Sequence, residues 1–490
     1  MLINHNGNFA AKEGFNLING HKVAAHSGES IPVYCPSDGL EFSRISRSSV
    51  ADVDAAVQSA HVAFHSEAWR KTSALERGRM ITKLMHLVER DREELAALES
   101  RDTGKPLRQG ISDVTATIRY FEFYGSAADK IHGDTIPFLD GYTALTLREP
   151  HGVVAGITPW NYPLQILARV LGAAIAMGNT LVVKPAEDAS LTSLHIAELA
   201  LEAGFPAGVF NVVTGYGHEA GAALSAHPLV DYVTFTGSTA TGTLIQQAAA
   251  QNNRGTTMEL GGKSAQIVFA DADLEVAAPV IINAIIQNGG QTCSAGSRVL
   301  IEKPIYEKLA AMLAERFSKL TAAPHWADGN LGPMITAKQA SRVEAFIDEA
   351  KASGIELLAR GNISPDVPNG GAYVAPALFG NVPENSKLAQ EEVFGPVLAL
   401  MPFDDEEHAI RLANSTQFGL VAGVWTKDGA RQHRVAKRVR AGQVYVNSYG
   451  AGGGIELPFG GFGKSGHGRE KGLEALLDMS ATKTVIFRHD

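Results

Sequence analysis

The sequence predicts an α/β protein with two doubly wound α/β domains and a small β element. Its 490 residues are too many for one compact core, so two or more domains are expected. From "GVVAGITP" onward, short β-rich runs alternate with helical stretches, which predicts parallel strands with helices on both faces of a sheet. The alternation restarts after Thr256, and this restart predicts the second domain.

The first part of the chain is expected to be helical over residues 51–132, where apolar residues recur at three- and four-residue spacing. The strands "GVVAGITP", "TLVVKP", "GVFNVVTG" and "YVTFTGS" follow, separated by helices. The first of these helices covers 164–177, the next ends at Gly204, and another begins at Thr239. This order predicts a Rossmann-like nucleotide-binding domain, although a fold by itself does not define a function.

The second domain begins with the strand "SAQIVFA" and the helix "LEVAAPVIINAIIQ", which ends at Gly289 and Gly290. The strand "SRVLIE" and the helix "IYEKLAAMLAERFSKL" come next. The strands "VLALMPF", "AGVWT" and "GQVYVN" follow, with helices near 404–413 and 429–440. Cys293 therefore lies in a short loop between a buried helix and a strand, and such loops often carry functional residues.

The composition excludes several classes of function. A formal net charge of −9, from 43 basic and 52 acidic residues, gives no electrostatic case for binding nucleic acid or an anionic membrane. Two cysteines cannot form a disulfide framework, and no Cys/His cluster suggests a metal site, so we expect no metal and a cytoplasmic location. No secretory leader is expected at the N-terminus, and the apolar stretches are too short to span a bilayer.

The stretch "GQTCSAGSR" contains Cys293, and the chain has only one other cysteine, Cys35. A thiol becomes a strong nucleophile only as the thiolate, which needs a polar pocket with a positive bias. The small residues around Cys293 allow a ligand to approach and offer backbone N–H donors. The residues alone leave two interpretations open, a nucleophile or a buried core thiol.

Two further motifs carry groups that suit catalysis. "TPWNYP" ends a predicted strand, and the amide of Asn161 could donate to an oxyanion; a simple turn explains the motif equally. "MELGGKS" sets Glu259 in an apolar segment, where a raised pKa would suit a general base. The alternative for Glu259 is a structural carboxylate bonded to backbone.

Two other motifs suit nucleotide binding. In "LVVKPAE", Lys184 and Glu187 could hold the hydroxyls of a ribose, unless they form a solvated pair. In "FTGSTATG", Gly237 and Ser238 lead into a helix whose N-terminus could bind a pyrophosphate, although Ser238 could be a simple N-cap. "GFGKSG" matches G-x-G-x-x-G but follows no predicted strand, so it is not a dinucleotide fingerprint.

Together with "EEVFGPV" and "PFGGFGKSGHGRE", these motifs, in this order, resemble the aldehyde dehydrogenase superfamily over nearly the whole chain. The resemblance implies an NAD-binding domain over 1–128 and 150–257 and a catalytic domain over 258–460. It also implies an oligomerisation element from 129–149 and 475–490, and assembly as a homodimer or homotetramer.

The resemblance further implies the catalytic roles. Cys293 would be the nucleophile, Asn161 would form the oxyanion hole with the Cys293 N–H, and Glu259 would be the general base. The thiolate would form a thiohemiacetal, hydride would leave to the nicotinamide, and water activated by Glu259 would hydrolyse the thioester. Glu470 would relay protons, but the lysine that often partners it is Val170 here.

The implied cofactor is NAD. A carboxylate at Glu187 would repel the 2′-phosphate of NADP, whereas Lys184 leaves NADP open as a second cofactor. The mechanism requires no metal. The implied cofactor contacts are Trp160, Lys184, Glu187, Gly221, Phe235, Gly237, Ser238, Leu260, Glu392 and Phe394.

Arg169 bears most on the substrate, because many members of the family carry a tryptophan there. Succinate-semialdehyde-type enzymes and some aromatic-aldehyde enzymes carry arginine, which could bind a substrate carboxylate; the alternative is an arginine held by a structural acidic partner. The second arginine of the semialdehyde enzymes is Gln287 here. We therefore expect an aldehyde with a remote carboxylate or an aromatic ring, not succinate semialdehyde itself. The expected substrate contacts are Tyr162, Arg169, Gln287, Thr292, Ser294 and Phe459.

Other interpretations stay open. Tyr449 would add to the aromatic wall of the tunnel, and the glycine-rich stretch 450–456 would leave room for a bulky group. A betaine-aldehyde-type enzyme is the rival, although Arg169 would repel its cationic substrate. A non-catalytic binding protein on the same fold and a cofactor-independent thiol esterase are the alternatives from other classes.

Overall fold

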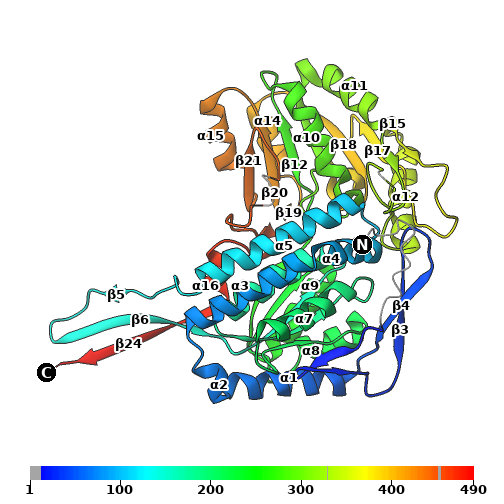
Figure 1. Cartoon of the computed structure of the whole chain (residues 1–490). Helices are drawn as coiled ribbons and strands as arrows, with labels where there is room; N and C mark the ends of the chain where they lie inside the picture. Colours follow the sequence, from blue (N-terminus) through cyan, green and yellow to red (C-terminus); the bar gives the residue numbers. More distant parts are fainter. Residues whose placement is uncertain (1–12, 328, 451–453, 490) are drawn as a thin grey trace.

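The computed structural model describes residues 13–327, 329–450 and 454–489. It consists of two α/β bodies, one above the other in Figure 1, and an arm of strands that projects from the lower body. Each body has its own mixed sheet with helices on both faces. The fold class predicted from the sequence, two doubly wound α/β domains with a small β element, is confirmed.

The first sheet has the strand order β2-β1-β9-β8-β7-β10-β11-β23 within the described residues. Its central strands β9 to β11 are parallel to one another. The chain runs from β7 outward to β8 and β9, and then returns to β10 on the other side of β7. This reversal creates a topological switch point between β7 and β10, where open α/β sheets bind ligands. The bounds are β1 Asn16–Ile18, β2 His21–Val23, β7 Val153–Thr158, β8 Thr180–Pro185, β9 Phe210–Val212, β10 Tyr232–Thr236, β11 Gly255–Glu259 and β23 Gly466–His467.

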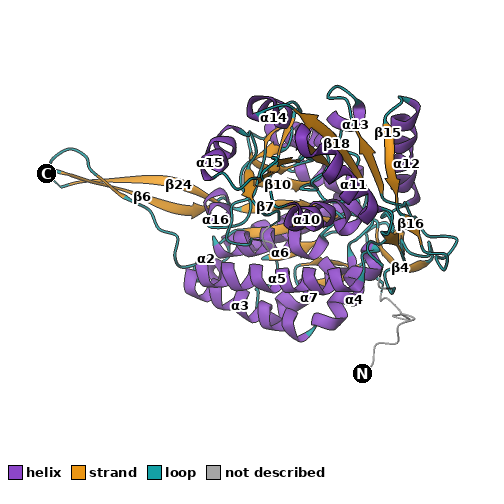
Figure 2. Ribbon diagram, turned by 90° about the horizontal axis from the view of Figure 1, so that it is seen from above, coloured by secondary structure: helices purple, strands orange, loops and turns teal. Residues whose placement is uncertain are grey.

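Helices cover both faces of this sheet, and each face has its own apolar core. The capping box at Ser73 and Glu76 begins one long helix, and Gly204, with φ of 98°, ends another. Figure 2 shows the long helices α3, α4 and α5 side by side. One face carries α3 Ala74–Arg90, α4 Arg92–Thr103, α5 Leu107–Ala127, α6 Pro163–Ala176 and α7 Leu191–Ala203. The other carries α1 Val50–His65, η1 Gly217–Gly221, α8 Ala222–Ser225 and α9 Thr239–Gln251, and the short α2 Glu67–Arg70 follows α1.

The second sheet has the order β15-β17-β18-β13-β12-β20-β21, and only its edge strand β15 is antiparallel to its neighbour within the described residues. Its central strands are buried on both faces, which explains why they are nearly continuous apolar runs in the sequence. The strands are β12 Ala265–Val268, β13 Arg298–Glu302, β15 Glu356–Arg360, β17 Ala377–Gly380, β18 Val397–Phe403, β20 Val421–Trp425 and β21 Gln443–Val446. The helices are α10 Leu274–Ile286, η2 Gln287–Gly290, η3 Lys303–Ile305, α11 Tyr306–Phe317, α12 Ala337–Ala352, α13 Lys387–Gln390, α14 Glu406–Ala413 and α15 Gly429–Arg438.

The arm is a three-stranded sheet in which β24 pairs with β6 from Ser480↔Pro150 to Arg488↔Tyr142. Figures 1 and 2 both show it extending away from the two bodies. It exposes large apolar side chains, including Ile486 and Phe487 at 54% and 53%. Its strands are β5 Thr135–Ile136, β6 Tyr142–Pro150 and β24 Ser480–Arg488.

The remaining elements are short pairs and one helix. In the part of the chain that the structure describes, no helix combines the length and apolar character needed to cross a membrane. The short elements are β3 Ser30–Tyr34 with β4 Glu41–Ser46, β14 Thr321–Ala322 with β16 Asn362–Ile363, β19 Phe418–Gly419 with β22 Phe462–Gly463, and α16 Glu474–Asp478.

Candidate active site

The candidate site lies where the carboxyl edge of the first sheet faces the amino edge of the second. Glu259 is the last residue of β11, and a five-residue crossing leads directly to Ala265, the first residue of β12. Cys293 comes just before β13, which pairs with β12 in the register Ala265↔Arg298. Two connections far apart in the sequence therefore meet at one edge, and they bring the Glu259 and Cys293 loops together.

Glycines make this approach possible. A Cβ on Gly262 would lie 2.4 Å from the carbonyl oxygen of Cys293, and a Cβ on Gly290 would lie 2.2 Å from the carbonyl oxygen of Gly395. The turn before Cys293 also has a left-handed backbone at Asn288, with φ of 50°. The glycines in "MELGGKS" and "GGQTC" thus allow backbone to pass against backbone.

Cys293 is a free, partly exposed cysteine that packs near Phe459, Tyr449 and Leu420. Burial of the thiol raises its pKa to about 12, and the Arg169 guanidinium acts in the opposite direction. The Glu259 carboxylate also favours the protonated thiol. The thiol is therefore protonated at neutral pH, and a nucleophilic Cys293 needs a base to take its proton.

Glu259 is 2% exposed, and neither carboxyl oxygen has a hydrogen-bond partner among the described residues. Burial raises the pKa of Glu259 well above its ordinary value, and the nearby Glu470 carboxylate raises it further. The Arg169 guanidinium opposes both effects. A carboxyl group without a fixed partner and with a raised pKa suits the uptake and release of a proton.

Asn161 follows β7 and lies against the turn before Cys293. Its Nδ2 donates to the carbonyl oxygen of Gln291 at 3.0 Å. Its own carbonyl oxygen accepts from Lys105 Nζ at 3.0 Å and from Asn288 Nδ2 at 2.8 Å. The Asn161 side-chain amide therefore contacts the turn before Cys293, and the Asn161 backbone carbonyl is held by two other donors.

Arg169 has an acidic partner. Its Nε lies 2.6 Å from Oε2 of Glu470, and both side chains are less than a tenth exposed. Thr234 Oγ1 donates to the other oxygen of Glu470 at 3.3 Å, and the guanidinium carbon of Arg169 lies 5.6 Å from the centre of the Phe459 ring. Val170, at the position of the absent lysine, is buried in the apolar core, so the cation beside Glu470 comes from the adjacent residue.

The terminal nitrogens of Arg169 differ from its Nε. The terminal nitrogens make no hydrogen bond to the described residues, and they are not fully buried. Nε, in contrast, is fully buried and lies against Glu470. The small exposed surface of Arg169 therefore includes its fork, while Nε faces Glu470. An arginine with an open fork can bind a planar carboxylate through two parallel hydrogen bonds.

Some of the predicted substrate contacts lie next to Cys293, and others do not. Tyr162 Oη lies 2.9 Å from Thr292 Oγ1, and the carbonyl oxygen of Ser294 accepts from Tyr449 Oη at 2.7 Å. These contacts bring aromatic rings to both sides of Cys293. Gln287 is exposed, and its carbonyl oxygen, rather than its side chain, accepts from Thr292 Oγ1 at 3.4 Å. The stretch 451–453, within the glycine run, lies outside the described residues.

The predicted ribose residues lie at the carboxyl end of β8. Lys184 Nζ contacts Oε2 of Glu187 at 2.8 Å. Burial acts to raise the pKa of Glu187, but the Lys184 ammonium holds it below its ordinary value, so Glu187 is an anion at neutral pH. A Cβ on Gly221 would lie 3.7 Å from Lys184 Cδ, which brings η1 beside the same pair.

The predicted phosphate and nicotinamide contacts lie along the same edge. Ser238 caps α9 and its Oγ accepts from the N–H of Thr241 at 3.2 Å. The rings of Trp160 and Phe394 meet edge to face at 5.4 Å. Glu392 Oε1 accepts from the N–H of Gly262 at 2.9 Å, and burial raises the pKa of Glu392 to about 7.

Phe235 and Leu260 are buried in the core of the first body. The Phe235 ring lies under Gly237, where a Cβ would approach it within 2.5 Å, and Leu260 lies under Gly242 in the same way. These two side chains pack beneath the start of α9, at the carboxyl edge of the first sheet. A carboxylate–ammonium pair, the N-terminus of α9 and an aromatic pair near a switch point are groups that fit a dinucleotide.

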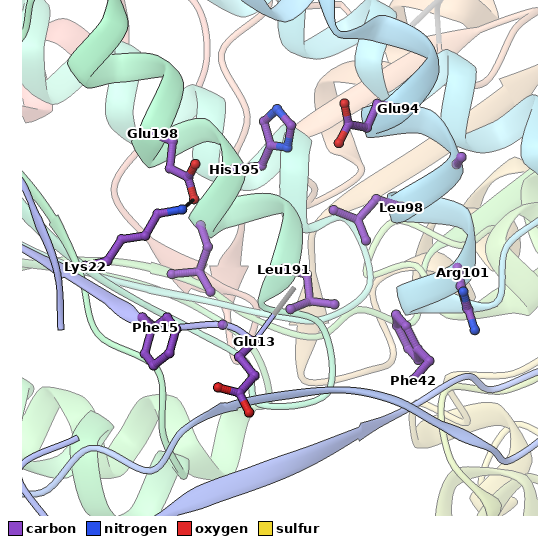
Figure 3. A pocket seen from close by; sticks show the side chains of 13 residues that line it. Glu13, Phe15, Lys22, Phe42, Glu94, Leu98, Arg101, Leu191, His195 and Glu198 are labelled. Carbon is purple, nitrogen blue, oxygen red and sulfur yellow. Dashed lines mark ion pairs between the residues drawn. The ribbon is translucent and has the colours of Figure 1, made fainter. Parts of the chain in front are cut away.

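One surface cavity lies away from these residues. It has a volume of about 210 Å³ and is lined by residues 13–15, β2, β4, α4 and α7. Figure 3 shows the side chains that line it. Phe15, Phe42 and Leu191 are among its apolar walls, and Lys22 forms an ion pair with Glu198 at its rim. None of the candidate catalytic or cofactor residues lines it. Among the described residues, no group of three His, Cys, Asp or Glu side chains could hold a metal ion.

The sequence did not single out three buried polar residues next to the site. Lys105 and Asn288 both contact the carbonyl oxygen of Asn161. Lys263 is 2% exposed and its Nζ has no partner among the described residues; burial lowers its pKa to about 7. The one available signal for Lys105 was a lysine between Gly104 and Pro106, where a chain turns between two helices.

Two α/β sheets that meet edge to edge over a cysteine loop, with a dinucleotide-type switch point alongside, define a protein of the dinucleotide-binding α/β class. The aldehyde dehydrogenase family model matches residues 22–485. Human retinal dehydrogenase 2 is 41% identical over 476 residues, which cover 96% of this chain and 91% of that protein.

Two further relatives agree. The NADP/NAD-dependent aldehyde dehydrogenase PuuC of Escherichia coli strain K12 is 40% identical over 481 residues, covering 96% of this chain and 94% of that protein. The NAD⁺ complex of an aldehyde dehydrogenase from Bacillus cereus is 39% identical with a TM-score of 0.96, covering 100% of this chain and 99% of that chain. The chain belongs to the aldehyde dehydrogenase family, whose members oxidise aldehydes to acids with NAD(P).

Proposed function

We propose that this aldehyde dehydrogenase oxidises an aldehyde bearing a remote carboxylate or an aromatic ring, with NAD as the preferred cofactor and Cys293 as the nucleophile. The observation that carries the substrate class is Arg169. Its guanidinium is buried beside the Phe459 ring and acts to lower the pKa of Cys293. Its terminal nitrogens have no hydrogen-bond partner among the described residues. A ring platform and an open cationic fork together favour an anionic or aromatic group on the substrate.

The reaction begins with proton transfer from the Cys293 thiol to Glu259. The thiolate adds to the aldehyde carbon, and the resulting oxyanion is stabilised by Asn161 Nδ2 and the Cys293 N–H. Bound NAD supplies the hydride acceptor. Loss of hydride from the thiohemiacetal carbon leaves a thioester on Cys293. Glu259 passes the thiol proton on towards Glu470 and is again a carboxylate, so it can take a proton from water as the water adds to the thioester carbon. The C–S bond breaks, the acid leaves, and the departing thiolate regains its proton from Glu259.

Two observations support roles for Glu470 and Glu259 in moving protons. The Glu470 carboxylate is close enough to influence the pKa of Glu259, and Arg169 contacts Glu470 directly. The Glu470 carboxyl, held by Arg169, is therefore a titratable group next to the general base. We therefore keep Glu470 as the relay and infer that Arg169 does for it what the lysine does in other members of the family.

The preference for NAD rests on the Lys184–Glu187 pair. Glu187 is an anion that already neutralises Lys184, so a 2′-phosphate would meet a carboxylate instead of a free ammonium. NADP is the second candidate, because the E. coli relative is named for both cofactors. The KM values for NAD and NADP, measured for the parent and for Glu187→Gln, test this: the variant should use NADP better.

The substrate test compares kcat/KM for carboxylated, aromatic and cationic aldehydes in the parent and in Arg169→Leu. The variant should lose about 10-fold or more on carboxylated aldehydes, because a charged hydrogen bond contributes about 1.5–3 kcal/mol. An equal loss on all three classes would mean that Arg169 serves only Glu470. Faster turnover of the cationic aldehyde by the parent would favour the betaine-aldehyde type instead.

The same assay separates the other classes. Cys293→Ala should abolish NADH formation, whereas a binding protein would form no NADH in the parent either. Ester hydrolysis without NAD, but no NADH formation, would favour the thiol esterase.

The assembly and location stay predictions. The exposed Phe138 and Leu139 in the arm, at 56% and 63%, favour burial against a second copy, and we propose a homodimer or homotetramer with 129–149 and 475–490 as its oligomerisation element. Light scattering on the purified protein would distinguish the two. A cytoplasmic location remains the expectation from the cysteine content.

A further inference from the structure

Lys105 is a buried cation that the reaction above does not use. It follows α4 at a turn formed by Gly104, with φ of 79°, and Pro106, and its side chain points inward at 1% exposure. Its Nζ lies 3.3 Å from Oε1 of Glu99 and also contacts Asp113. Buried ion clusters add little net stability compared with apolar residues, so stability alone is a weak reason for this one.

The cluster reaches the active site through the third partner of Lys105. Nζ donates to the carbonyl oxygen of Asn161 at 3.0 Å, and it lies 4.5 Å from the centre of the Tyr162 ring. Asn288 Nδ2 donates to the same carbonyl oxygen at 2.8 Å. One ammonium therefore contacts two successive residues just before α6.

We propose that Lys105 is a positioning residue that fixes Asn161 by its backbone carbonyl and so keeps the Asn161 amide aimed at the oxyanion formed on Cys293. The inference rests on the proposed role of Asn161. Holding the peptide between Asn161 and Tyr162 fixes the Cα from which the amide extends. Oxyanion stabilisation depends on donors that are already in place, because reorganisation during the reaction would reduce their effect.

The charge of Lys105 suits this role. Burial acts to lower the pKa of Lys105, but the Asp113 and Glu99 carboxylates hold it above its ordinary value, so the group stays an ammonium. A charged donor makes a stronger hydrogen bond to a carbonyl oxygen than a neutral one. Gln165 Nε2 donates to the other oxygen of Asp113 at 2.6 Å, which ties the cluster to the first turn of α6.

A double-mutant cycle tests the proposal in the full-length enzyme with NAD and a good aldehyde substrate. Lys105→Met removes the donor at similar length, Asn161→Ala removes the amide, and the double variant combines them. The expected loss for Lys105→Met is about 10- to 100-fold in kcat, with KM for aldehyde and NAD changed less than about threefold, as for a small misplacement of a catalytic group. In the Asn161→Ala background, Lys105→Met should reduce kcat less than about threefold.

The control is Thr192→Val, which removes a 3.2 Å hydrogen bond to Glu99 Oε2 on the far side of the cluster without touching Lys105. It should keep kcat within about twofold of the parent, which separates loss of the cluster's stability from loss of the Asn161 contact.

The outcomes are distinguishable. Multiplying losses in the double variant would overturn the role of Lys105 while leaving Asn161 as the oxyanion donor. Full activity of Asn161→Ala would instead reject the proposed function of Asn161. Should Lys105→Met fail to fold, Asp113→Asn weakens the hold on Lys105 with nearly the same shape; a kcat equal to the parent would overturn the inference, and a selective fall in kcat would support it.

Discussion

Arg169 Nε lies 2.6 Å from Oε2 of Glu470, and this ion pair sits beside the Phe459 ring at the edge of the cysteine site. The pair joins a residue of the first body's α6 to a residue near the end of the chain. It neutralises one side of the guanidinium and leaves the other side open. Arg169 therefore can serve as the cation for Glu470 and as a contact for substrate at the same time.

Glu470→Gln should strengthen the binding of anionic substrates. Without the Glu470 carboxylate, the guanidinium charge is no longer neutralised, so a substrate carboxylate meets a stronger field. We expect KM for carboxylated aldehydes to fall about threefold or more, while KM for neutral aromatic aldehydes stays within twofold. Steady-state kinetics on both classes is the measurement, and unchanged KM for the anionic class would contradict an open Arg169 fork.

Arg169 should control the reactivity of the Cys293 thiol. The Arg169 guanidinium is the main influence that lowers the pKa of this thiol, which burial raises to about 12. Arg169→Leu should therefore move the alkylation of Cys293 by iodoacetamide to higher pH and slow it at pH 8. The reaction of Cys293→Ala gives the background from Cys35. An alkylation profile that does not move would show that the two groups do not interact.

Glu259→Gln should stabilise the fold at alkaline pH. The folded-state pKa of Glu259 is raised, so burial favours the protonated carboxyl, and stability is lost as pH rises through that pKa. The neutral amide removes this dependence. We expect the variant to gain about 1–3 kcal/mol at pH 8 and much less at pH 4.5, where Glu259 is protonated in the folded state and only about half ionised in the unfolded chain.

Denaturant unfolding of the parent and of Glu259→Gln at the two pH values measures this difference. If the variant gains as much stability at pH 4.5 as at pH 8, the gain comes from better packing and not from removal of the buried charge. NADH formation should be lost at both pH values, which would show that a more stable site is a less active one.

Gly262→Ala should greatly reduce activity although it removes no catalytic side chain. The new Cβ would lie 2.4 Å from the carbonyl oxygen of Cys293, so the cysteine turn has to move. A displacement of this size at the nucleophile is expected to reduce kcat about 100-fold. Gly429→Ala is the matched control, because a Cβ there meets nothing within 4 Å.

Kinetics and circular dichroism on both glycine variants complete the test. A fully active Gly262→Ala would mean that the loop carrying Gly262 shifts freely, and that the approach of the two loops is not needed for catalysis.

Much of the architecture could be predicted because short stretches of sequence indicate each strand and each helix end. The strands of both sheets are short apolar runs bounded by turn residues, and Gly204 and Thr239 mark helix ends where expected. The motifs around Cys293, Glu259 and Asn161 were recognisable by their order along the chain. Asn161 and Glu259 lie at one edge because β7 and β11 are parallel strands of the same sheet, whereas Cys293 reaches this edge from the amino end of β13 in the second sheet.

The contacts between distant segments could not be predicted in this way. The resemblance placed the partner of Glu470 at position 170, but nothing in the sequence indicated that Arg169 would take that place, and nothing near Lys105 indicates the carbonyl of Asn161. The sequence by itself determined the fold class, the family and the candidate nucleophile, because periodicity and motif order are local properties. Tertiary structure alone decided which charges meet, because a buried charge is stabilised by whichever partner the packing of remote elements brings within hydrogen-bond distance.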